Sequence, residues 1–284
     1  MTQILQTPPS PLPIYLKAAM TAGRKPPPGV SLPPLQVALM NVRTDPARLD
    51  AYRQVCGLAE APGLPLTYPQ IAATGLHMHL MTQPQFPFPL LGLVHVRNRI
   101  RQTRPLGVDE AYDLHVSLGE VREARAGLEF DLLTEARVGD EAVWEASTTV
   151  LYRNRKPAAA GGKPPPPPAD TTLSEYRSFA APADIGRRYA RVSGDYNPIH
   201  LYPVTARLFG FPRAIAHGMW SLARCLGELE AELARTPREL EVQFKQPLLL
   251  PARLALKFRA QGDQISFALL SSSADKVHLS GSLG

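Results

Sequence analysis

The most informative stretch of the sequence is Tyr189-Ala-Arg-Val-Ser-Gly-Asp-Tyr-Asn-Pro-Ile-His200, and His217-Gly-Met219 follows it 17 residues further on. The first segment places an acid, an amide and an imidazole within six residues. The second segment places a glycine at the start of an apolar pattern with helical spacing. Carboxylate and imidazole groups transfer protons, and a helix start stabilises a developing negative charge. The two segments therefore predict a site that moves a proton and stabilises an oxyanion.

A loop is expected after the helix that ends at residue 194. Pro198 cannot continue a helical hydrogen-bond ladder, so residues 195–200 are predicted to be irregular and to aim Asp195 and His200 at one point. Such a pair can act as general acid and base on one water. Asn197 would orient that water or hold the loop, and Ser193 would donate a second hydrogen bond. The alternative is an ordinary turn, because Asp and Asn are common turn residues.

His217 and Gly218 open the predicted long helix. Free backbone N–H groups at such a start favour negative charge, and glycine lets a substrate carbonyl approach the backbone closely. The alternative is that Gly218 is only a tight packing point between helix and sheet.

Composition limits the functional classes. The chain has 284 residues, is 44% hydrophobic and carries a net charge of +6, which suits an anionic small molecule but does not require nucleic acid. Two cysteines outside any CxxC pair favour reduced thiols, and we expect neither a metal nor a cofactor. We see no apolar run long enough to span a membrane and no signal peptide, so a cytoplasmic protein is expected.

Thirty prolines divide the chain. Residues 1–34 form a proline-rich segment, and we expect its residues 7–34 to be extended on the surface or partly mobile. Residues 157–171, which include the run 164–168, are predicted to be a polyproline spacer between a first unit (35–156) and a second unit (172–284). A ligand for a proline-binding partner is the alternative for the spacer.

The two units resemble each other. Tyr52-Arg-Gln-Val-Cys-Gly57 matches Tyr189-Ala-Arg-Val-Ser-Gly194, and residues 104–114 match residues 246–256, which makes an internal duplication the favoured interpretation. At the offset of 137 residues, the first unit has neither acid nor imidazole where the second has both. In this alignment, Leu58, Glu60 and Gly63 correspond to Asp195, Asn197 and His200. We therefore predict one active site per chain.

Hydrophobic periodicity predicts an α+β fold. In the first unit, a strand near residues 35–39 precedes a helix with Asp45 as N-cap, Pro46 at its first position and Gly57 past its end. In the second unit, a helix runs from about residue 184 to Gly194, and the longest helix is predicted over residues 218–235. Four alternating strands follow, with connections too short for parallel crossovers. One long helix wrapped by an antiparallel sheet, twice over, is the predicted architecture.

The pattern Tyr-x-x-x-Ser-Gly-Asp-x-Asn-Pro-Ile-His, with Ala206, Gly210-Phe211 and Ile215-Ala-His-Gly-Met219, closely resembles the MaoC-like (R)-specific enoyl-CoA hydratases. The match is dense over residues 189–223 and looser in the first unit. The resemblance implies a double hot-dog fold. It also implies that Asp195 and His200 are the catalytic pair, that Asn197 is the supporting amide, and that the Gly218 N–H contacts the thioester carbonyl.

The implied reaction is reversible hydration of a trans-2-enoyl thioester to a (3R)-hydroxyacyl thioester. CoA substrates of medium or longer chain are expected, because a first unit without the catalytic residues could widen the acyl tunnel. Three alternatives remain: a dehydratase that uses acyl carrier protein, a non-catalytic acyl-binding subunit, and a thioesterase. A monomer and a homodimer are both compatible with a doubled fold.

Other substrate contacts are expected from residues around the motif and from basic side chains suited to phosphate. These are Ser193, His217, Met219, Phe211, Lys245, Arg97 and Arg99. The two arginines could equally form a solvated strand face. The first-unit histidines His77, His79, His95 and His115 are expected to have no role.

Overall fold

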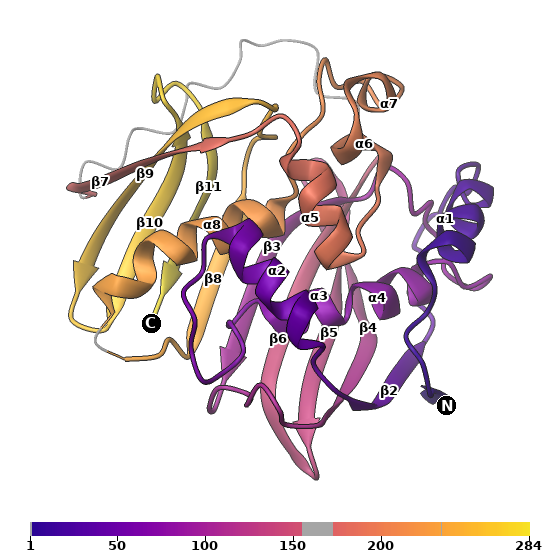
Figure 1. Ribbon diagram of the computed structural model, residues 1–284. Helices are drawn as coiled ribbons and strands as arrows, with labels where there is room; N and C mark the ends of the chain where they lie inside the picture. The colour runs from indigo at the N-terminus through magenta and orange to yellow at the C-terminus, as the bar shows by residue number, and fades with distance from the viewer. Residues whose placement is uncertain (1, 155–172, 234) are drawn as a thin grey trace.

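The computed structural model describes residues 2–154, 173–233 and 235–284, and the predicted spacer at 157–171 lies outside them. The described strands form one eleven-stranded sheet with helices on one side (Figure 1). The first unit contributes β2 (Gln36–Val42), β3 (Val94–Gln102), β4 (Tyr112–Ala124), β5 (Gly127–Val138) and β6 (Glu141–Arg153). The second contributes β7 (Glu175–Ala181), β8 (Glu239–Phe244), β9 (Ala252–Gln261), β10 (Gln264–Ser271) and β11 (Val277–Leu283).

The two units repeat one strand order. The N-terminal segment adds β1 (Thr2–Leu5) at one edge. The sheet runs β1-β2-β4-β5-β6-β3-β8-β11-β10-β9-β7, so from its outer edge each unit has the order first, third, fourth, fifth and second strand. The two halves meet where β3 pairs with β8 in antiparallel register, with Asn98 opposite Val242. This repetition supports the internal duplication. The last four strands, β8 to β11, pair antiparallel, which confirms the predicted antiparallel sheet of the second unit.

The central helices pack across the boundary between the units. α2 (Pro46–Cys56) has Asp45 as its N-cap and Gly57 in the left-handed conformation after its end, as predicted. α5 (Ile185–Ser193) ends in the same way at Gly194, and the rings of Tyr52 and Tyr189 lie 6.2 Å apart at their centroids. The matched helices α2 and α5 therefore contact each other in the core, between the two halves of the protein.

The longest helix of the second unit is shorter than predicted. α8 spans Gly218–Leu229, and a 3₁₀ turn (η1, Glu230–Glu232) follows it instead of a continuation to residue 235. The buried face ends at Leu229, whereas the next three residues are Glu, Ala and Glu and none of them is buried. Burial of an apolar face is what stabilises a helix in a protein, so the helix ends where that face ends.

The expected extended conformation of residues 7–34 is also wrong, for the stretch 11–20. Thr2–Leu5 forms β1, which pairs in parallel with β2, and Pro11–Met20 forms helix α1. α1 begins with prolines at its first turn, where a missing N–H costs nothing. Thr21 and Arg24 then tie the segment to the first unit through hydrogen bonds to Leu90 N and to the carbonyls of Gln83 and Phe86.

The remaining helices surround the candidate site or fill the first unit. They are α3 (Tyr68–Ala72), α4 (Thr74–Met81), α6 (Pro198–Leu201) and α7 (Pro203–Arg207). Among the described residues, no helix is both long and apolar enough to cross a membrane.

Candidate active site

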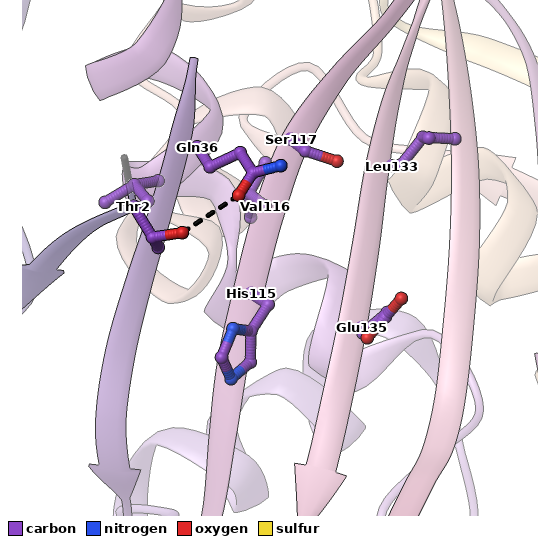
Figure 2. A pocket seen from close by; sticks show the side chains of 8 residues that line it. Thr2, Gln36, His115, Val116, Ser117, Leu133 and Glu135 are labelled. Atoms are coloured by element: carbon purple, nitrogen blue, oxygen red, sulfur yellow. Dashed lines mark hydrogen bonds between the residues drawn. The ribbon is translucent and has the colours of Figure 1, made fainter. Parts of the chain in front are cut away.

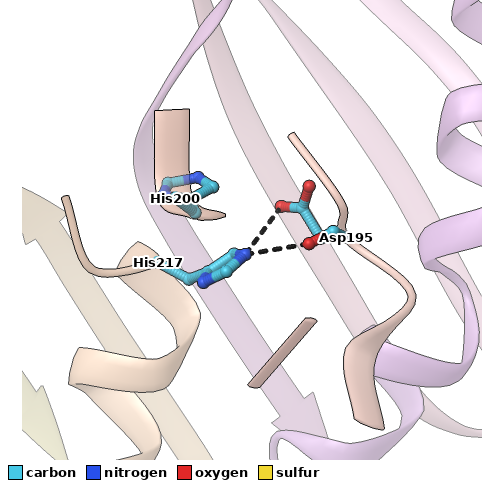
Figure 3. Close-up of side chains that lie close together, drawn as sticks. All are labelled: Asp195, His200 and His217. Carbon is cyan, nitrogen blue, oxygen red and sulfur yellow. Dashed lines mark hydrogen bonds and ion pairs between the residues drawn. The ribbon is translucent and has the colours of Figure 1, made fainter. Parts of the chain in front are cut away.

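Asp195, His200 and His217 converge at the ends of three helices (Figure 3). Asp195 follows α5, His200 lies in α6, and His217 is the N-cap of α8. One ligand-type atom from each side chain lies within 4.8 Å of the others. The structure thus brings together the two residues predicted to be catalytic, and it adds His217 beside them.

The loop that carries Asp195 is held by local hydrogen bonds. The Asp195 N–H donates to Ser193 Oγ at 3.2 Å, and the Asn197 N–H donates to Asp195 Oδ1 at 3.0 Å. Ser193 therefore accepts a hydrogen bond here. Residues 198–201 form helix α6 rather than the predicted irregular loop, because Asn197 Oδ1 accepts from Ile199 N and Pro198 occupies the first turn. Asn197 thus holds the loop by capping α6.

His200 is buried and has a defined tautomer. Its Nδ1 lies 2.9 Å from the carbonyl oxygen of Ile215, which can only accept, so Nδ1 carries the proton and Nε2 is bare. Burial lowers the pKa of His200 below 6.5, against the opposing effect of Asp195. The imidazole is therefore neutral at pH 7 and can accept a proton at Nε2.

His217 stacks on His200, with ring centroids 3.8 Å apart. Its Nε2–H donates to the backbone carbonyl of Asp195 at 3.0 Å and lies 3.8 Å from Asp195 Oδ2. Burial, with a smaller effect from His200, lowers the pKa of His217 to about 3. His217 is therefore neutral, and it fixes the loop through its N–H.

The Asp195 carboxyl is ionised. Partial burial alone would raise its pKa, but His217, His200, the Asn197 N–H and the Tyr15 hydroxyl together lower it below 3.8. The side chain retains 35% of its surface exposed, so a substrate can reach it. The site accordingly pairs an accessible carboxylate with a neutral imidazole.

Tyr15 of the N-terminal segment and His95 of the first unit also approach the site, although the sequence did not single out Tyr15 and His95 was expected to have no role. Tyr15, on α1, donates from its hydroxyl to Asp195 Oδ1 at 3.1 Å. His95, on β3, lies close enough to Asp195 for the carboxylate to oppose the lowering of its pKa by burial, and its ring centroid is 4.8 Å from that of Phe244. Both contacts join residues about a hundred or more positions apart, so no local sequence signal marks them.

Gly218 begins α8, where the first-turn N–H groups have no partner within the helix. A Cβ at this position would lie 3.0 Å from the Phe244 ring. Tight packing against the sheet is therefore one reason for glycine, and it is compatible with an N–H that faces the substrate.

The other predicted contacts differ in burial and in their partners. Met219 is partly buried against the core, and Phe211 is half-buried with its N–H on the carbonyl of Ala206. Lys245 is exposed and directly follows Phe244. Arg97 and Arg99 pair with Glu129 and Glu241. Both arginines alternate along β3 with the buried Asn98 and Ile100, which places them on the outer face of the sheet and favours the strand-face interpretation.

The cluster is better suited to proton transfer than to metal binding. Three ligand-type side chains are close enough to hold an ion. However, His217 Nε2 carries a proton that it donates to a carbonyl, and His200 Nδ1 does the same. The two histidine protons are thus held by backbone carbonyls, and an imidazole with a free nitrogen stays within 4.8 Å of the Asp195 carboxylate, which suits an acid–base pair.

A separate hollow lies on the first-unit part of the sheet (Figure 2). Its lining comes from β1, β2, β4 and β5 and includes His115 and Glu135, and it shares no residue with the cluster. Thr2 donates a hydrogen bond to Gln36 across its rim. We therefore place the chemistry at the Asp195 cluster.

The repeated strand order and the helices packed on the sheet define a doubled hot-dog fold. Residues 157–281 match the MaoC-like domain. The chain is 40% identical over 264 residues to 3-hydroxyacyl-thioester dehydratase X of Mycobacterium tuberculosis, covering 90% of this chain and 91% of that protein. The chain belongs to the MaoC-like dehydratase family.

Other similarities agree with this assignment. A segment of 32 residues is 59% identical to peroxisomal enoyl-CoA hydratase 2 of Arabidopsis thaliana, which is 11% of this chain and 10% of that protein. The crystal structure of HtdX from M. tuberculosis superposes with a TM-score of 0.75 at 35% identity, over 87% of this chain and 98% of that one. A further M. tuberculosis protein, described as a double hotdog fold, matches with a TM-score of 0.52 at 14% identity, over 87% of this chain and 94% of its own, and supports the fold alone.

Proposed function

We propose that the chain catalyses the reversible hydration of trans-2-enoyl thioesters to (3R)-hydroxyacyl thioesters at the Asp195–His200 pair. The observation that carries this proposal is the bare Nε2 of a neutral, buried His200 beside an accessible, ionised Asp195. The relatives named as hydratases and dehydratases support the same reaction class.

The protonation states suggest which group is the base. The Asp195 pKa is held low, so its carboxylate is a poor proton acceptor. His200 Nε2 therefore removes a proton from water as the water oxygen bonds to the β-carbon. Asp195 orients that water and stabilises the imidazolium that forms. The imidazolium then returns its proton to the α-carbon, so that one O–H and one C=C π bond break while one C–O and one C–H bond form.

The start of α8 supports the negative charge that develops during this addition. As the water adds, electron density moves onto the thioester carbonyl oxygen and produces an enolate-like anion. The N–H of Gly218 is proposed to donate to that oxygen, aided by the dipole of a twelve-residue helix. One such donor contributes about 3 kcal/mol to a transition state.

We propose a CoA thioester of medium or longer chain as the substrate. The first unit has Leu58, Glu60 and Gly63 at the positions of the catalytic residues, so it is free to cover the acyl chain instead of repeating the chemistry. The exposed Lys245 follows Phe244, whose ring packs against Gly218, and is therefore the basic side chain that we propose for the carrier. Acyl carrier protein presents a similar anionic thioester arm and is the alternative carrier.

We propose that the enzyme is cytoplasmic and that one chain supplies all residues of the active site. The two described cysteines, Cys56 and Cys225, are buried and unpaired, which suits a reducing compartment. Tyr15, His95, Asp195 and His200 all come from one polypeptide, so a monomer can hold the site, and a homodimer would only bring two such sites together.

The test is hydration of crotonyl-, octenoyl- and branched enoyl-CoA, with chiral analysis of the product and the same acyl groups on acyl carrier protein. We expect (3R)-hydroxyacyl-CoA, with octenoyl-CoA preferred over crotonyl-CoA. A (3S) product or no hydration of any thioester would reject the reaction. Strict preference for the four-carbon substrate would reject the role of the first unit, and release of free thiol would reveal a thioesterase.

A further inference from the structure

The N-terminal helix α1 delivers one polar side chain to the active site. Tyr15 lies 180 positions from Asp195 in the sequence, and its hydroxyl donates to Asp195 Oδ1 at 3.1 Å. The residue before it, Ile14, is buried in the protein. Arg24 and Thr21 hold the end of the segment against the first unit. The contact is thus made by an anchored helix.

The two oxygens of the carboxylate have different partners. Oδ1 accepts from both the Tyr15 hydroxyl and the Asn197 N–H, at 3.1 and 3.0 Å. Oδ2 lies 3.8 Å from His217 Nε2, beyond hydrogen-bond distance. Two donors on Oδ1 fix the rotation of the carboxylate and leave Oδ2 as the oxygen that can accept from a water.

We propose that Tyr15 is a positioning residue for the hydration site, which holds the Asp195 carboxylate so that Oδ2 meets the reacting water. The inference rests on the proposed function for its catalytic consequence, and on the hydrogen bond for its geometric part. The N-terminal segment would then support the chemistry of the second unit through α1, in addition to the support that the first unit gives through the shared sheet.

Tyr15 suits this task because it stays a donor. Burial, followed by the charge of Asp195 and the hydrogen bond to it, raises the pKa of the phenol. The hydroxyl therefore remains protonated over the working pH range of the enzyme. A phenylalanine at this position would keep the ring and remove only the donor.

The other ionisable groups that face Asp195 come from four elements. They are His95 on β3, Tyr189 on α5, His200 on α6 and His217 before α8. The hydroxyl of Tyr15 and the N–H of Asn197 are the two donors that act on Oδ1. Removing one of them raises the pKa of Asp195, because the charged carboxylate loses stabilisation.

The experiment compares the full-length wild-type chain with Tyr15→Phe. Tyr176→Phe is the matched control, because it deletes the same hydroxyl from an exposed tyrosine on β7. Steady-state hydration of octenoyl-CoA is measured across pH. The carboxyl of Asp195 is also titrated by ¹³C NMR in aspartate-labelled protein, with its resonance assigned by its loss in Asp195→Asn.

We expect Tyr15→Phe to lower kcat about tenfold, since a hydrogen bond to a charged group is lost, and to leave KM within about twofold. Its Asp195 resonance should titrate at higher pH than in the wild type. Tyr176→Phe should match the wild type in both measurements.

Three results for Tyr15→Phe would overturn the inference. The first is an unchanged kcat, and the second is a higher kcat, which would mean that the hydroxyl obstructs the water. The third is a lower kcat with an unchanged Asp195 titration, which would indicate a merely structural role. The NMR titration does not depend on turnover. If the wild-type chain hydrates none of the thioesters, the proposed function fails, while the titration still decides whether Tyr15 acts on Asp195.

Discussion

Substituting Gly186 by alanine should displace His200 without changing any catalytic group. A Cβ at position 186 would lie 1.9 Å from the carbonyl oxygen of His200. An ordinary contact needs about 3.4 Å, so α5 and α6 would have to separate by about 1.5 Å. A displacement of about 1 Å at a catalytic group can reduce a rate about 100-fold. Overpacking of this kind also costs about 1–3 kcal/mol of stability.

The assay is hydration of octenoyl-CoA by Gly186→Ala, with circular dichroism and thermal unfolding on the same samples. We expect kcat to fall about 100-fold or more in a protein that is still folded at the assay temperature. Gly23→Ala is the control, because a Cβ there would meet nothing within 4 Å. A folded Gly186→Ala enzyme with wild-type kcat would show that the α5–α6 contact does not position His200.

Three further predictions concern pH and the carrier. The acid limb of kcat/KM should lie below pH 6.5, because burial lowers the pKa of His200 and the imidazole must be neutral to accept a proton; a limb centred above pH 7 would contradict this assignment. The free energy of unfolding should fall as the pH drops below 6.5, because three buried histidines take up protons in the unfolded chain but not in the folded one. Urea unfolding should show a loss approaching about 4 kcal/mol per pH unit. A flat profile would argue against the burial of these histidines as neutral groups. The histidines and their pKa values are His77 at about 3, His95 at about 4 and His217 at about 3. Lys245→Ala should raise KM for CoA thioesters, whereas Arg99→Ala should change KM less than about twofold, because Arg99 is paired with Glu241. A larger KM increase for Arg99→Ala than for Lys245→Ala would indicate that the arginines bind the carrier.

The local parts of this structure could be predicted from the sequence. Asp45, Pro46 and Gly57 mark the ends of α2 because capping and left-handed glycine are properties of a few adjacent residues. The antiparallel strands of the second unit follow from alternation and short connections. The convergence of Asp195 and His200 follows from the motif, although Pro198 begins a helix instead of an irregular loop.

The rest depended on contacts between distant segments. Proline content suggested an extended N-terminal segment, yet α1 forms because its prolines occupy the first turn and its buried face packs on the first unit. The approach of Tyr15 and His95 to Asp195 then depends on tertiary packing and on the pairing of β3 with β8. Arg97 and Arg99 show the same dependence on distant segments. Their alternation predicts a strand, but only the folded structure shows that Glu129 and Glu241 pair with them.

The most direct test of a single acid–base site in the second unit is the hydration rate of Asp195→Asn and His200→Ala beside Glu60→Gln. Glu60 is an exposed first-unit residue at the position equivalent to Asn197, so its change from acid to amide matches the chemistry of Asp195→Asn. We expect the two site variants to lose several orders of magnitude in kcat with native circular dichroism, and Glu60→Gln to retain wild-type turnover with a (3R) product. Near-normal turnover by either site variant would contradict the assignment of Asp195 and His200 as the catalytic pair.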